Sequence, residues 1–134
     1  MEGFVSGKEF KINEVFLNFE KEIMEKFISE NDEHAEMLKL QYKNAHIKSR
    51  EFTGCGFITD FNIADEYRIS NIDRLGLWGN FRAEINDLMY GVGFLLIIKD
   101  GLIHELDCHS FGGEGFPTDL KFYRFFSISE GYIK

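Results

Sequence analysis

Hydrophobic residues change their spacing once along this chain, near residue 46. Before that point they recur every three or four positions, which predicts an amphipathic helix with one apolar face. The charged residues of this segment, Glu20 among them, are expected mostly on its other faces. The predicted apolar face consists of Ile12, Val15, Phe16, Phe19, Ile23, Met24 and Phe27.

A second helix is predicted directly after the first. Either Ser29 or Asn31 can cap its start, because short polar side chains accept hydrogen bonds from the first free backbone amides. Two helices joined this closely form either an antiparallel pair or one bent helix. The apolar face of the second helix consists of Ala35, Leu38, Tyr42 and Ala45.

From residue 46 onward the spacing is two, which is typical of strands with one buried face. Strands are predicted over residues 47–53 and 57–63. Gly54 and Gly56 lie between them and either turn a hairpin or form a bulge in one long strand.

Residues 64–79 have a loop-like composition, with a short strand near 67–72 and Trp78 after it. Trp78 either fills the core from this loop, which we favour, or is an exposed anchor for a partner. Strict alternation over residues 81–85 then predicts a half-buried strand.

The clearest strand is predicted over residues 94–98, where apolar residues occupy both faces. Such a strand is expected at the centre of a sheet with cover on both sides. Asp100-Gly101 follows and favours a tight hairpin turn, so residues 102–111 are expected to return antiparallel. A last strand of alternating residues is predicted from Leu120, Phe122, Phe126 and Ile128.

This order predicts an α+β fold, with two N-terminal helices followed by an antiparallel sheet of about five or six strands. The 134 residues fit one domain, with helices over about 11–45 and the sheet over about 46–130. Apolar residues make up 44% of the chain, which is enough for a packed core.

The net charge of −8 restricts the partners that the chain can bind. Nucleic acids and acidic membranes need a basic surface and are therefore not expected. A basic protein partner is compatible with this charge, although solubility alone also explains it. A homodimer that pairs sheet edges is a further arrangement.

Cysteine usage and the chain start indicate the compartment. Cys55 and Cys108 are too few and too far apart for a disulfide framework. No basic and apolar secretory signal follows Met1, and the longest apolar run, 92–98, is too short to cross a bilayer. We expect a cytoplasmic protein, with Cys55 buried as a small hydrophobic residue rather than acting as a nucleophile.

The segment from His104 to His109 is the densest group of metal-ligand residue types. Its histidines are five apart, whereas a metalloprotease helix needs them four apart. On a strand, His104 and Cys108 are expected on one face, and Glu105, Asp107 and His109 on the other. A zinc site needs a third ligand that no spacing identifies, so we expect no metal and interpret the second face as a contact surface.

Glu114 lies in a glycine-rich loop, where functional residues are often found. Paired with Asp60, Asp107 or Asp119 it would supply acid–base chemistry, as paired carboxylates do. A turn that needs glycine explains the same loop without chemistry. No cofactor or nucleotide motif is present, so we expect no cofactor.

The last two thirds of the chain contain three patterned segments, namely Arg50-x-Phe52-Thr53-Gly54-x-Gly56-Phe57-x-Thr59-x-Phe61, Gly93-Phe94-x-Leu96-x-x-x-Asp100-Gly101-x-Ile103-x-x-Leu106 and Gly112-x-Glu114-x-x-Pro117. They resemble a group of small bacterial proteins that have N-terminal helices and this hairpin. No activity is established for that group, so the resemblance implies no catalytic residue.

We therefore favour a non-catalytic protein-binding module. Some acidic bacterial domains of this size resemble immunity proteins, which neutralise a toxin, and acidic inhibitors associate quickly with basic toxins. The alternative is a small enzyme or ligand-binding domain with Glu114, His104 and His109 near the glycine loops. The predicted partner contacts are Trp78, Glu105, Asp107, His109 and Glu114.

Overall fold

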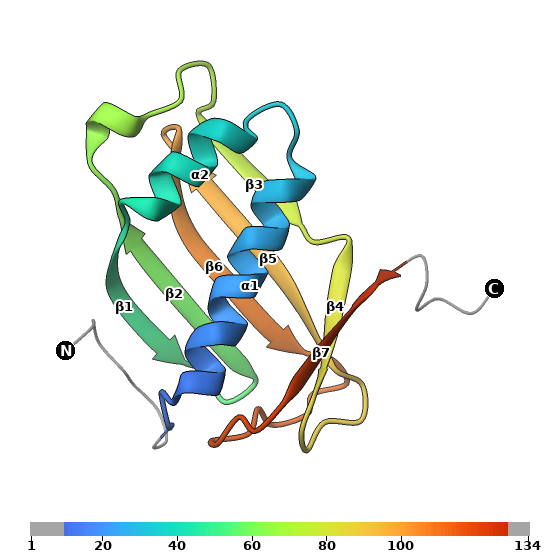
Figure 1. The fold of residues 1–134 in the computed structure, drawn as a ribbon. Helices are drawn as coiled ribbons and strands as arrows, with labels where there is room; N and C mark the ends of the chain where they lie inside the picture. Colours follow the sequence, from blue (N-terminus) through green and yellow to red (C-terminus); the bar gives the residue numbers. More distant parts are fainter. Residues whose placement is uncertain (1–9, 129–134) are drawn as a thin grey trace.

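The computed structural model describes residues 10–128 and confirms the predicted α+β fold, with two helices followed by an antiparallel sheet (Figure 1). The elements are α1 (Glu14–Glu30), α2 (Ala35–Lys43), β1 (His46–Phe52), β2 (Gly56–Asn62), the 3-10 turn η1 (Asp65–Tyr67), β3 (Arg74–Trp78), β4 (Phe81–Ile85), β5 (Val92–Lys99), β6 (Leu102–Ser110) and β7 (Tyr123–Ser127). Within the described residues the sheet has seven strands in the order β1-β2-β6-β5-β4-β7, and β3 also pairs with β5.

Both helices lie on one face of the sheet, which we call the inner face (Figure 1). Aromatic residues of α1 pack on strands that are distant in sequence. The rings of Phe16 and Phe57 have centroids 4.9 Å apart, and those of Phe27 and Phe81 are 5.1 Å apart. Burial of these large rings is a main source of stability. The apolar face predicted for α1 is therefore the face that meets the sheet.

The predicted start of the second helix is wrong. Asn31 ends α1 through its backbone amide, and the hydroxyl of Ser29 bonds to the carbonyl of Lys26 within α1. The chain then turns before α2 begins after His34, whose side chain makes no capping hydrogen bond. Neither helix of residues 10–128 is long and apolar enough to span a membrane.

Glycines define the two hairpins that bring β6 to the centre of the sheet. Asp100 and Gly101 have φ values of 54° and 74°, as the predicted tight turn requires. Gly54, with φ 93°, turns the hairpin between β1 and β2, which settles the choice between turn and bulge. A Cβ atom on Gly56 would lie 1.8 Å from the carbonyl oxygen of Cys108, so only glycine allows β2 to approach β6 here.

Residues 64–79 contain more regular structure than the sequence predicts. The short strand expected near 67–72 lies instead at Arg74–Trp78, where β3 pairs with β5 from Lys99 to Leu95. Trp78 is therefore a strand residue, and not a loop residue. Leu75 and Leu77 point to the inner face, so Trp78 points to the opposite one.

The prediction that β5 is covered on both faces is wrong. Its position at the centre of the sheet is as expected, and Phe94, Leu96 and Ile98 are buried against the inner face. Leu95 and Ile97 point to the other face, where no helix of residues 10–128 covers them, and they remain half-buried. We call this second side of the sheet the open face.

The last strand uses a different face from the one predicted. It runs over Tyr123–Ser127, and Phe125 lies opposite Ala83, which is fully buried on the inner face. Phe126 consequently points to the open face, and Phe122 is exposed before the strand begins. Five aromatic or β-branched residues lie within residues 120–128, so alternation alone is compatible with either face of this strand.

Candidate functional site

The open face holds a row of residues that crosses five strands. In this row Glu51 of β1 lies opposite Ile58 of β2, and Ile58 lies opposite Asp107 of β6. Asp107 lies opposite Leu95 of β5, and Leu95 lies opposite Trp78 of β3. The row therefore runs from an acidic end on β1 to an aromatic end on β3, with Asp107 between two apolar side chains, Ile58 and Leu95.

A neighbouring row places two carboxylates against each other. Asp60 of β2 lies directly opposite Glu105 of β6, and Ile97 of β5 lies on the other side of Glu105. Like charges in directly opposed positions destabilise a sheet. The Ser49 hydroxyl donates a hydrogen bond to Asp60 at 3.1 Å. No Lys or Arg within residues 10–128 forms an ion pair with Asp60 or Glu105.

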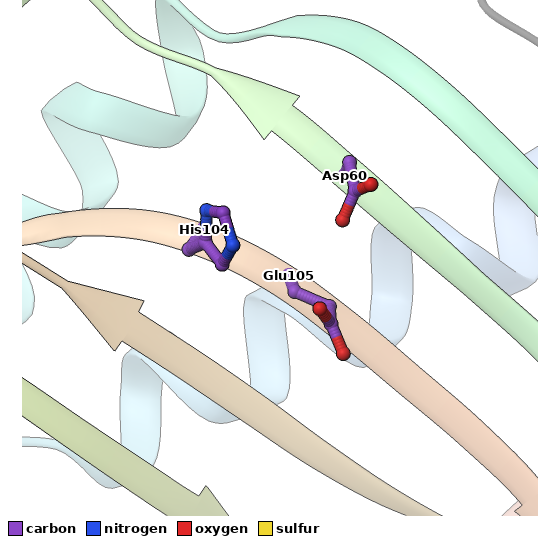
Figure 2. Close-up of side chains that lie close together, drawn as sticks. All are labelled: Asp60, His104 and Glu105. Atoms are coloured by element: carbon purple, nitrogen blue, oxygen red, sulfur yellow. The ribbon is translucent and has the colours of Figure 1, made fainter.

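A β-bulge adds His104 to this pair of carboxylates. The register between β5 and β6 shifts between Ile97 and Ile98, which lie opposite Glu105 and Ile103 respectively. His104 is thus the extra residue, and such a residue leaves the strict alternation of the strand. Its imidazole and the carboxylates of Asp60 and Glu105 have ligand atoms all within 4.8 Å of one another (Figure 2).

The predicted face of His104 is therefore wrong. Strict alternation would put His104 beside Leu106 and Cys108, both of which are buried on the inner face. The bulge lets Ile103 take the inner position instead, and Ile103 is buried. The prediction for Glu105, Asp107 and His109 agrees with the register, since all three lie opposite open-face positions.

Partial burial has an electrostatic cost for the acids of the open face. The pKa of Glu105 is raised by burial first and then by the nearby charges of Asp60 and Asp107. Burial also raises the pKa of Asp107, against a smaller opposing effect of His109. These groups are therefore less stable as carboxylates here than they would be in the unfolded chain.

Replacing Glu105 with glutamine is expected to raise the free energy of unfolding at pH 7 and low salt, by roughly 0.2–1 kcal/mol. The gain arises because the variant no longer holds two opposed negative charges. An acid with a raised pKa costs stability above that pKa, so the gain should fade as the pH falls and the wild-type carboxyl group binds a proton. Urea unfolding at pH 7 and at pH 3 measures both effects.

Glu51→Gln is the control for this prediction, because Glu51 is exposed and lies opposite Ile58 rather than an acid. It should change the free energy of unfolding little at either pH. An unchanged or lower value for Glu105→Gln at pH 7 would contradict repulsion between Asp60 and Glu105.

Aromatic side chains gather at the other end of the open face, around Gly93. Trp78 is 68% exposed, and its ring centroid lies 6.1 Å from that of His109. His109 in turn packs edge-on against Phe111 at 5.4 Å, and the Arg82 guanidinium lies 4.5 Å from the centroid of Phe111. The expectation that Trp78 fills the core is wrong, and its other interpretation, an exposed anchor, agrees with this position.

Gly93 makes this aromatic group possible. A Cβ atom at this position would lie 2.7 Å from Cζ of Phe111 and 3.2 Å from Nε2 of His109. The missing side chain lets the two rings lie over the central strand, a known use of glycine in sheets. Any larger residue at position 93 would push the rings away.

Glu114 differs from the other four predicted contact residues. Its two carboxylate oxygens accept hydrogen bonds from the backbone amides of Met89 and Tyr90, each at 2.9 Å. The carboxylate thus holds the loop before β5 in place. Charge-assisted hydrogen bonds of this kind are strong, so a structural role explains Glu114.

The three residues of the alternative enzyme hypothesis do not converge. His104 and His109 lie five positions apart on β6, or about 16 Å at about 3.3 Å per residue. Glu114 is engaged by the loop before β5. The hollow nearest the glycine loops has a volume of about 380 Å³ and is lined by Phe10, Phe52, Thr53, Gly54, Gly56, Gly115, Phe116 and Thr118, none of which is ionisable.

The two cysteines also lie apart. Cys108 is buried on the inner face, and burial raises the pKa of its thiol well above the ordinary value. Cys55 is exposed at the turn between β1 and β2, so the prediction of a buried Cys55 is wrong. The turn conformation directs this side chain outward, although its neighbours in sequence are small and apolar.

Comparisons of this chain with protein-family models, with curated proteins and with solved structures give no match. No relative therefore indicates a function, and the open face is the surface from which we infer one. Sequence reasoning missed Leu95 and Ile97 of this face because it expected cover on both sides of β5, and it also left out Ile58 of β2. The tight Asp100-Gly101 turn could have identified Leu95 and Ile97, because it fixes which residues of β5 lie opposite which residues of β6. That register places Leu95 and Ile97 on the same face as Asp107 and Glu105.

Proposed function

We propose that this chain is a non-catalytic protein-binding module that binds a basic protein partner through the open face. The observation that carries the proposal is the grouping of Trp78, Glu105, Asp107 and His109 on the one side of the sheet that no helix of residues 10–128 covers. Partly exposed apolar side chains lie between them. A sheet face of this kind is costly to leave in water, and a partner removes that cost.

The chemistry of the face favours a cationic partner. Tryptophan is among the residues that contribute most to protein interfaces, and Trp78 has the exposure of an anchor. Lys or Arg side chains of a partner would pair with Glu105 and Asp107, whose pKa values are raised chiefly by their partial burial. The net charge of −8 would also speed association with a basic protein.

Within this class, the immunity type fits best. An immunity protein acts in the bacterial cytoplasm and needs to bind its toxin quickly, which an acidic surface favours when the toxin is basic. It needs a rigid surface and no catalytic group. The open face is built on paired strands, which hold side chains more firmly than loops do.

The test begins with capture of partners from the organism that encodes the chain, followed by binding measurements with the purified partner. Trp78→Ala is expected to weaken binding at least 30-fold, as loss of a tryptophan hot spot does. Asp107→Lys is expected to slow association and to reduce the salt dependence of the association rate.

Two variants on the helix side serve as controls. Leu40→Ala removes an exposed apolar residue of α2, and Glu25→Lys reverses an exposed charge of α1. Both should bind as the wild type does. Equal binding by all four variants, or a captured partner that is acidic, would refute the proposal.

A further inference from the structure

We propose that Asp60, His104 and Glu105 form a binding site for one divalent transition-metal ion, for which zinc is the probe. The inference is independent of the protein-binding proposal, since it needs no partner. It rests on the arrangement of three side chains from two neighbouring strands (Figure 2).

The three side chains provide a set of ligands of mixed chemistry. One imidazole nitrogen and two carboxylate oxygens lie within 4.8 Å of one another, and all three residues are half-buried. In a tetrahedral zinc site with bonds of about 2.1 Å, ligand atoms are about 3.4 Å apart. Side-chain rotations that move the ligand atoms by about an ångström are enough to close the set around an ion. The backbone need not move, because the two strands that carry these residues are already paired.

Charge favours a doubly charged cation at this position. Asp60 and Glu105 together carry two negative charges, and a neutral imidazole adds none. No Lys or Arg of residues 10–128 forms an ion pair with either carboxylate, and the positive charge of Arg74 acts on Glu105 only from beyond contact distance. A divalent ion would cancel the repulsion between these two directly opposed carboxylates.

The surroundings allow an ion to enter and keep its ligands oriented. A hollow of about 340 Å³ adjoins Asp60 and His104 and has Lys48, Arg68 and Lys99 in its lining. These cations line the approach but do not pair with the two carboxylates. The Ser49 hydroxyl bonds to Asp60, and such outer partners fix the orientation of metal ligands.

The imidazole determines the class of metal. Magnesium and calcium prefer sites made of oxygen ligands alone, whereas imidazole suits zinc and related transition metals. Three protein ligands leave a coordination position for water, as in open zinc sites. We therefore expect one zinc ion per chain.

The test is thermal unfolding of the full chain, first treated with a chelator and then titrated with zinc. At zinc 100 times above its fitted Kd, Tm is expected to rise by about 10 °C for a protein of this size. His104→Ala, Asp60→Asn and Glu105→Gln should each abolish most of that rise. Calorimetric titration should give one zinc per chain.

Glu105→Gln gives the sharpest comparison because its effect should change sign. Without metal this variant should melt above the wild type, since one of two opposed charges is gone. With zinc it should melt below the wild type. Its stability without metal also keeps the test valid if His104→Ala does not fold.

Matched controls exclude other zinc-binding groups. His46→Ala removes an exposed histidine of β1, and Cys55→Ser removes the exposed thiol. Both should keep the full zinc response. No rise in Tm, or a rise that persists in both His104→Ala and Glu105→Gln, would overturn the proposal. Partner binding that persists in chelator would leave the protein-binding proposal intact, so the two proposals can fail separately.

Discussion

Replacing Arg50 with methionine is expected to lower the free energy of unfolding by about 3–5 kcal/mol. Arg50 lies on the inner face and is only 2% exposed, and Glu20 of α1 is 5% exposed. The guanidinium donates two hydrogen bonds to the Glu20 carboxylate, at 2.7 and 3.0 Å, and the hydroxyl of Thr59 donates another. Without Arg50 the carboxylate would stay buried with no compensating charge.

The triple variant Arg50→Met, Glu20→Leu and Thr59→Val separates the cost of a lone charge from the value of the ion pair. Removing all three polar groups leaves an apolar contact of similar volume, so most of the lost stability should return. Urea unfolding of the single and triple variants measures the difference. A triple variant as unstable as Arg50→Met would contradict this explanation.

Arg124→Met is the matched control. Arg124 also binds a carboxylate, that of Glu84 at 3.0 Å, but both side chains are exposed on β7 and β4. Water screens such pairs, and their loss costs about 0–1 kcal/mol. A large loss in Arg124→Met would show that burial is not the deciding difference between the two pairs.

The sequence predicts the layers of this fold better than it predicts its buried charges. Helical spacing correctly identifies Phe16, Phe19 and Phe27 as residues that meet the sheet. The same spacing places Glu20 with the solvated residues, although it is buried. Its partner Arg50 lies on a strand 30 residues away. The spacing of residues within one helix cannot predict this ion pair, because the pair forms only when α1 packs on β1.

The open face was predicted in part. Alternation of residues correctly groups Glu105, Asp107 and His109, because that part of β6 is regular. It fails at His104, since a bulge inserts one residue and period two no longer applies. Asp60 could not be added to the group from the sequence, because its position opposite Glu105 depends on the pairing of β2 with β6.

These failures have a common physical origin. Strand periodicity reports which residues share a face within one strand, but not which strands are neighbours. The metal-site proposal needs both kinds of information, and the missing part comes from long-range pairing. The protein-binding proposal depends less on it, since the sequence alone already identifies Trp78 and Asp107 as candidate contact residues.

Replacing Gln41 with leucine is expected to lower the free energy of unfolding by about 2–5 kcal/mol, through two backbone groups that lose their partners. Gln41 is fully buried in α2, and its amide donates to the carbonyl oxygens of Tyr67 and Gly101 at 2.9 and 2.8 Å. Its carbonyl accepts from the Ile103 amide at 2.8 Å. Gly101 would keep a second donor, the Ile69 amide, whereas the groups of Tyr67 and Ile103 would not be satisfied.

The position of Ile103 explains why a side chain is needed there. The strand β2 runs on to Asn62, but it pairs with β6 only from Gly56 to Asp60, so the start of β6 has no paired neighbour on this side. Gln41 supplies the hydrogen bonds that continued pairing with β2 would have made. It thereby joins α2 to the hairpin turn and to the bulge that orients His104.

Urea unfolding and hydrogen exchange together test this role. In Gln41→Leu the Ile103 amide should lose more exchange protection than amides at the centre of β5, because the start of β6 would open locally. Lys39→Leu, an exposed change in the same helix, should alter stability by no more than about 0.5 kcal/mol. Equal losses in the two variants would mean that the buried amide contributes little. Because Gln41 also holds the segment that carries His104, Gln41→Leu should weaken the zinc response even where the protein remains folded.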